Sequence, residues 1–127
     1  MSLAGRRAEL ARRAIRVVKS VVASLPDDLR DLAEGLPVVC EHEVARHWIE
    51  DGVEDDSLGL FSGPARDEPL DPECLESPLV TLFVDNIWDY AEGDPDAFDD
   101  EVRTTYLHEF GHYLGLEEDD LEERGLL

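Results

Sequence analysis

Near its C-terminal end the chain carries the stretch His108-Glu109-Phe110-Gly111-His112-Tyr113-Leu114-Gly115-Leu116-Glu117-Glu118-Asp119. Two histidines stand four residues apart, with a carboxylate beside the first, and a glycine and three acids follow the second. Because four residues make about one helical turn, both imidazoles can reach one metal ion from the same side of a helix. This order of residues is typical of a zinc site.

The residues before the motif favour a helix over roughly residues 97–114, with Asp99 or Asp100 as its N-cap. At about 100° per residue, one side of that helix collects an apolar arc. The arc comprises Val102, Tyr106, Leu107, Phe110, Tyr113 and Leu114. His108 and His112 fall on the opposite side, whereas histidines that only filled a core would lie on the arc. The projection therefore favours metal binding, and Gly115, which tolerates positive φ, is expected to end the helix.

The chemistry of such a site assigns a role to each residue. His108 and His112 supply two zinc ligands, and a catalytic zinc needs a third protein ligand plus an open position for water. Glu109 lies one step round the helix from His108, where it can take a proton from the zinc-bound water and pass it to the leaving group. The motif thus predicts a hydrolase with Glu109 as general base. The third ligand is expected among the acids that follow: Glu117, Glu118 and Asp119.

Upstream, the sequence predicts a scaffold of helices and short strands. Apolar residues at helical spacing run through residues 6–25, and a short second helix follows Pro26. We interpret the first helix, although basic, as covering the core rather than binding a membrane. The predicted strands are residues 38–44, 58–61 and 79–84, and a short helical turn follows at residues 87–90.

Two of these strands carry further expectations. The strand at 79–84 is almost continuously apolar, which predicts burial on both faces. Glycine and loop residues flank the strand at 58–61, which suits the edge of a sheet. His42 and His47 have no nearby partner in the sequence, and we expect both to be surface residues.

The motif His108-Glu109-x-x-His112-x-x-Gly115-x-x-Glu118 resembles that of the metzincins, with Glu118 where the third histidine usually stands. A closer resemblance is to a small bacterial family of minimal zincin-like metallopeptidases. It is carried by Leu25-Pro26, Gly59-Leu60-Phe61-Ser62-Gly63, residues 79–84 and residues 108–121. The chain's one methionine is Met1, so the methionine turn of full metzincins is missing and the resemblance is to a minimal version.

The resemblance implies one zincin-like α+β domain over residues 1–127, with an N-terminal helix, a small mixed β-sheet and a C-terminal active-site helix. On this frame Glu118 fits the third-ligand spacing best, followed by Asp119 and then Glu117. The implied cofactor is Zn²⁺, and the implied activity is hydrolysis of a peptide or protein substrate. In zincins an edge strand commonly pairs with the substrate backbone, and here residues 58–61, which we prefer, or 79–84 could serve.

The net charge and the cysteine content limit which binding partners and which cellular compartment are expected. The chain has 32 acidic and 11 basic residues, a net charge of −21, which repels nucleic acid and anionic lipid and favours basic peptides. No run of about 18 apolar residues is present, so no membrane span is expected. Cys40 and Cys74 are interpreted as free thiols of a cytoplasmic protein, with one disulfide as the open alternative.

The sequence therefore predicts a zinc metallopeptidase, with two alternatives. One is a zinc-binding but non-catalytic module whose acidic face docks a basic partner. The other is a metal-free protein in which the motif arose by chance. The oligomeric state is not indicated by the sequence, and the acid excess with little lysine suggests a salt-adapted host as a hypothesis.

Overall fold

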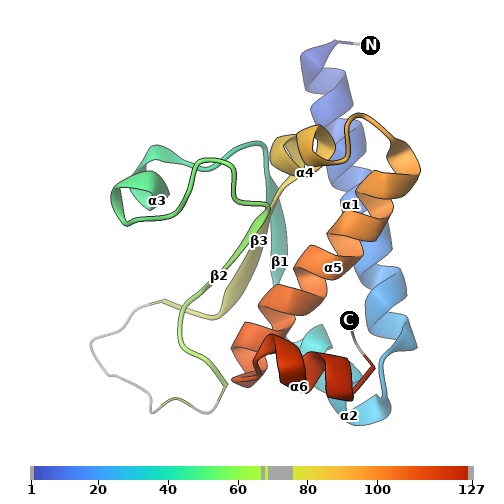
Figure 1. Ribbon diagram of the computed structural model, residues 1–127, viewed down its shortest axis with the longest axis vertical. Coiled ribbons are helices and arrows are strands. Elements are labelled where there is room, and N and C mark those ends of the chain that lie inside the picture. The colour runs from blue at the N-terminus through green and yellow to red at the C-terminus, as the bar shows by residue number, and fades with distance from the viewer. Residues whose placement is uncertain (1, 67, 69–75, 126–127) are drawn as a thin grey trace.

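The computed structural model describes residues 2–66, 68 and 76–125 (Figure 1). Cys74 lies outside these residues, so its pairing with Cys40 is not tested. The elements, in chain order, are α1 (Leu3–Ser24), α2 (Asp27–Glu34), β1 (Val38–Glu41), α3 (Arg46–Glu50), β2 (Gly59–Ser62), β3 (Leu79–Phe83), α4 (Val84–Tyr90), α5 (Pro95–Leu114) and α6 (Glu118–Glu123). None of the helices in the described part is long and apolar enough to cross a membrane.

The three strands form a small mixed sheet in the order β1-β3-β2. β1 runs parallel to β3, and β2 runs antiparallel to it. The predicted α+β class is therefore confirmed, as are the edge position of β2 and the burial of β3, whose last four residues are buried. β1 ends at Glu41 rather than at the predicted residue 44. Glu41 pairs with Phe83, and the next residue of the neighbouring chain segment already belongs to α4, so the strand ladder stops there. One more backbone contact follows, in which the N–H of Asp85 on α4 donates to the carbonyl of His42 at 2.9 Å.

Helix α5 forms the centre of the core. Its buried side chains pack with those of α1 in one hydrophobic cluster, and Figure 1 shows the two helices crossing beside the sheet. The predicted apolar arc is confirmed at Val102, Tyr106, Leu107 and Phe110, each at most 1% exposed. The predicted caps Asp99 and Asp100 are wrong: Asp94 caps the helix by accepting the N–H of Asp96 at 3.1 Å. Pro95 at the first helical position fits, because its ring presets a helical φ and removes an N–H that would lack a partner there.

Charge pairs fix the basic helix α1 against the acidic body. The guanidinium of Arg13 donates two hydrogen bonds to Asp99 on α5, at 2.6 and 2.8 Å. Arg7 donates to Asp85 on α4 at 2.9 Å. Bidentate guanidinium–carboxylate pairs fix orientation as well as distance. The first helix thus covers the core, as expected from its apolar stripe.

Two short helices, α3 and α6, were not anticipated from the sequence. Helix α6 packs onto α5 through Leu121, which is 1% exposed. A Cβ atom at Gly111 would lie 2.7 Å from Cδ1 of Leu121, so glycine within the motif allows this approach. α6 therefore covers the last turns of α5, as Figure 1 shows.

Strand β2 approaches α5 equally closely on the side of the motif. A Cβ atom at Gly59 would lie 2.6 Å from Cγ2 of Thr105, 3.3 Å from the carbonyl oxygen of Thr81 and 3.5 Å from Cγ of Glu109. Real Cβ atoms essentially never come within 3.0 Å of another heavy atom. Gly59 therefore determines how near the edge strand lies to the helix.

This close approach predicts a specific stability effect. Gly59→Ala should lower the free energy of unfolding in urea by about 1–3 kcal/mol, the usual cost of overpacking. Thr105→Ser removes the clashing methyl group and keeps a hydroxyl, so the double variant should recover most of the loss. A Gly59→Ala variant as stable as the parent, or a loss unchanged by Thr105→Ser, would contradict this packing.

Candidate metal centre

The two motif histidines and the glutamate between them lie together on the outer side of α5. His108 is half-buried, Glu109 is buried at 8% exposure, and His112 is exposed. The imidazole centroids are 4.6 Å apart, and Nδ1 of His112 lies 3.4 Å from Oε2 of Glu109. The helical spacing of the motif thus produces the side-by-side arrangement that the projection predicts.

The donor atoms of these three residues lie close enough for the two histidines to share one metal ion with the Glu109 carboxylate beside it. One ligand atom from each lies within 4.8 Å of the other two. Zinc binds imidazole nitrogen at about 2.0–2.1 Å, so two ligands of one tetrahedral ion lie about 3.3 Å apart. Among the described residues, His108, Glu109 and His112 are the one group of at least three His, Cys, Asp or Glu side chains close enough together to hold a metal ion.

The third-ligand candidates lie just beyond the helix. Gly115 adopts φ +75° and ends α5, as predicted. The N–H of Leu116 then donates to the carbonyl of Gly111 at 2.8 Å, which turns the chain back. Glu117 is the N-cap of α6 and forms a capping box with Asp120, whose carboxylate accepts the N–H of Glu117 at 3.1 Å.

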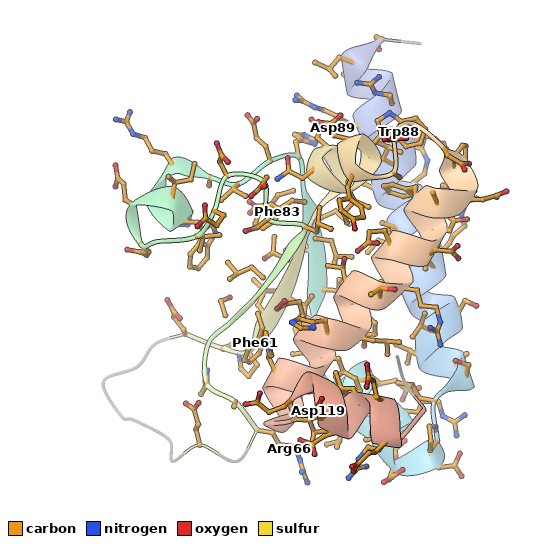
Figure 2. All side chains as sticks on the ribbon, viewed as in Figure 1. Phe61, Arg66, Phe83, Trp88, Asp89 and Asp119 are labelled. Carbon is orange, nitrogen blue, oxygen red and sulfur yellow. The ribbon has the colours of Figure 1, made fainter. Side chains whose placement is uncertain are left out.

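Glu118 and Asp119 open helix α6. Asp119 is exposed, and Figure 2 shows it on the part of α6 that lies against the end of α5. Glu118 is the first residue of α6, and its side chain is outside the described part of the structure. The backbone therefore brings the acids to the motif end of α5, and the choice among their side chains stays a prediction.

A cleft of about 320 Å³ lies beside the histidine–glutamate group. Ser57, Leu58 and Gly59 form its strand wall, and Glu101, Thr104, Thr105, His108 and Glu109 form its helix wall. The hydroxyl of Thr105 donates to Oε1 of Glu101 at 3.4 Å. Glu101 was missed from the sequence, although its spacing of four and eight residues from Thr105 and Glu109 places it on the same side of the helix.

Near the C-terminal end of α5, aromatic side chains pack strand β2 against the helix. Phe61 of β2 lies 5.8 Å from Tyr113 of α5, between ring centroids, and the N–H of Arg66 donates to the carbonyl of Tyr113 at 2.8 Å. Figure 2 shows Phe61 and Arg66 at this end of the molecule, near Asp119. The edge strand is therefore held to the helix on both sides of the motif.

The other two histidines lie away from the motif. His42 and His47 are exposed, as expected, and His47 packs against Trp48 with ring centroids 4.7 Å apart. Neither belongs to the metal-binding group.

The comparison with known families agrees with this geometry. The sequence model of the zincin-like metallopeptidase family matches residues 33–126. The chain belongs to that family. The match spans β1 through α6 and includes every residue of the metal centre, which confirms the resemblance seen in the motif. No curated protein matches the chain at a significant level.

Proposed function

We propose that this zincin-like protein is a zinc-dependent peptidase whose centre is formed by His108, Glu109 and His112. The observation that carries the proposal is the grouping of these side chains on one side of α5, at a cleft bordered by an edge strand. Family membership supports hydrolysis of a peptide bond, and the cleft lies directly beside His108 and Glu109.

Each side chain has a defined task in this proposal. His108 and His112 hold the zinc ion through ring nitrogens. When bound, zinc supplies Lewis acidity, which lowers the pKa of water and polarises a carbonyl group. Glu109 accepts a proton at Oε2 from the attacking water and transfers it to the departing amine. Its burial against β2 holds the carboxylate in one place, so little reorganisation is needed.

The edge strand gives the substrate its direction. β2 pairs with β3 along one side, and residues Ser57–Gly59 form a wall of the cleft. An extended peptide that adds to this edge by backbone hydrogen bonds would run past His108 and Glu109. Strand addition fixes the scissile bond without requiring a deep pocket for each side chain.

We assign the third zinc ligand to Glu118. Its spacing from His112 fits the family frame, and the turn after Gly115 brings the start of α6 back toward the motif. The capping bond of Glu117 leaves Asp119 as the alternative. A carboxylate is a common partner of two histidines at a catalytic zinc.

The cleft also favours a basic substrate side chain. Glu101 is half-buried on its helix wall, within two turns of His108, and its carboxylate already accepts a hydrogen bond from Thr105. A lysine or arginine side chain could pair with the remaining carboxylate oxygen. The net charge of −21 attracts the same substrates over longer distances.

Zinc titration tests the ligand set. His112→Ala should weaken zinc binding by more than about 100-fold, because loss of even an outer partner of a ligand costs about 10–100-fold. Glu118→Ala, which also removes a proposed ligand, should weaken zinc binding by at least about 10–100-fold, whereas His47→Ala on α3 should leave it unchanged. If Asp119→Ala weakens binding and Glu118→Ala does not, Asp119 is the ligand.

Glu109→Gln separates metal binding from chemistry. The amide keeps the shape of the side chain but accepts no proton, so cleavage of a peptide library should fall by about 10²–10⁴-fold while zinc content stays at the parent level. Glu122→Gln, an equal charge change at an exposed site on α6, serves as the control. If Glu109→Gln cleaves as fast as the parent, the mechanism is wrong. A zinc-loaded parent without cleavage would favour the non-catalytic module.

Substrate profiling tests the role of Glu101. The parent should cleave peptides with lysine or arginine near the scissile bond about tenfold faster than matched glutamine peptides, in line with one charge-assisted hydrogen bond. Glu101→Gln should abolish this preference and leave cleavage of neutral peptides unchanged. Asp100→Asn, the exposed neighbour on the same helix, should keep the preference. If the parent cleaves peptides without preferring basic ones, the proposed role of Glu101 is wrong, and the proposed peptidase activity is unaffected.

A further inference from the structure

One side chain of α4 holds the segment that leads into β2. Nδ2 of Asn86, in the first turn of α4, donates to the carbonyl oxygen of Asp55 at 3.0 Å and to that of Ser57 at 2.8 Å. Helix α4 directly follows β3, and Figure 1 shows it beside the chain that joins α3 to β2. An asparagine amide nitrogen carries two N–H donors, so Asn86 spends both of them on this one segment.

The same segment is also tied to the sheet. The N–H of Phe83 donates to the carbonyl of Leu58 at 2.9 Å. In an antiparallel pair, successive residues turn their N–H and C=O groups alternately toward the partner strand and away from it. The register of β2 on β3 therefore directs the backbone groups of Gly59 and Phe61 to the outer side of the sheet, where β2 is the edge strand.

The held segment continues into the strand wall of the metal-site cleft. Residues Ser57–Gly59 form that wall, and the facing helix wall carries His108 and Glu109. The three residues before Ser57 are acidic and exposed, so burial contributes little to fixing them, and their like charges repel one another. The hydrogen bonds from Asn86 oppose this repulsion and restrain the wall at its beginning.

We propose that Asn86 is a positioning residue for substrate binding, which holds residues 55–57 so that the edge of β2 is presented to an extended peptide in the cleft. Asn86 belongs neither to the cleft lining nor to the metal-binding group, so it acts through the strand wall. This role rests on the proposed peptidase function and adds that the affinity for the peptide depends on α4. An edge that is already fixed lowers the cost of ordering the protein when the peptide binds.

Asn86→Asp tests this role on the full, zinc-loaded chain. Aspartate keeps the shape of the side chain, but its oxygens donate no hydrogen bond and repel the two carbonyl groups. The KM for an extended, lysine-containing peptide that the parent cleaves should rise by about five- to tenfold, the order that ordering a flexible binding segment costs. The kcat and the zinc affinity should stay at the parent level, because the metal centre is not altered.

A charge-matched control separates the lost hydrogen bonds from the added charge. Asp89 is exposed on the same helix, so Asp89→Asn alone should behave as the parent. The double variant Asn86→Asp/Asp89→Asn has the net charge of the parent and should show the same rise in KM as Asn86→Asp. If the double variant recovers the parent KM, charge rather than position explains the effect and the proposal is wrong.

Hydrogen exchange measured by NMR follows the wall without a substrate. The amides of Ser57 and Phe83 donate within the wall, whereas the amide of Val80 donates on the β1 side of β3. In Asn86→Asp the first two should exchange about five- to tenfold faster relative to Val80, which corresponds to the loss of about one net hydrogen bond. Unchanged relative exchange would overturn the role of Asn86 in holding the wall.

Asn86→Ala keeps the test decisive if the aspartate variant does not fold, because it removes the donors without adding a charge. It should raise KM in the same direction. An unchanged KM in a folded variant, or a lower kcat without a rise in KM, would reject the positioning role while the peptidase function stands. A parent that cleaves nothing would reject the proposed function and the role in substrate binding together, and the exchange rates would still decide whether Asn86 holds the wall.

Discussion

The contact between Gly59 of β2 and Thr105 of α5 is the constraint on which the candidate site depends. A side chain at position 59 would meet the methyl group of Thr105 at 2.6 Å, so the edge strand can lie at its present distance only with glycine there. That distance sets the width of the cleft beside His108 and Glu109 and buries the glutamate against the strand. The same contact therefore determines both how β2 packs on α5 and where the Glu109 carboxylate lies. Gly111 repeats the arrangement at the other end of the motif, where it admits Leu121 of α6.

Helix α5 packs into the hydrophobic core on one side and presents the reactive groups on the other. Its apolar side packs against α1, and the pairs Arg13–Asp99 and Arg7–Asp85 anchor the basic first helix to the acidic remainder. Its other side presents ionisable groups, with Glu109 sheltered and His112 exposed. A rigid element with its orientation fixed on one side is a suitable support for groups that must stay in place. This division explains how a chain of 127 residues with a three-stranded sheet can present an ordered site.

Much of this arrangement was predictable from the sequence, and the misses have physical causes. Helical periodicity, the apolar run at 79–84 and the left-handed Gly115 are local signals, and the corresponding predictions were confirmed, except that the strand ends at Phe83 and Val84 begins α4. The sheet order and the end of β1 depend on pairing between distant segments. Helix α6 depends on one buried leucine fitting over a glycine, which no local pattern reveals. The predicted start of α5 at residue 97 is late, because Asp94-Pro95, an N-cap followed by a proline at the first helical position, is the helix-start signal that the structure uses. Glu101 belongs to no motif, and only its spacing of seven residues from His108 indicates that it lies on the same side of the helix.

The central claim is that one metal ion held on α5 makes this acidic protein a peptidase. Its most direct test is to strip the full chain with a chelator, return zinc stepwise, and follow cleavage of a lysine- and arginine-containing peptide library against bound zinc. The account predicts that stripping abolishes cleavage and that full activity returns at one zinc ion per chain. Cleavage that survives complete removal of the metal, or a chain with one bound zinc that cleaves nothing, would contradict it.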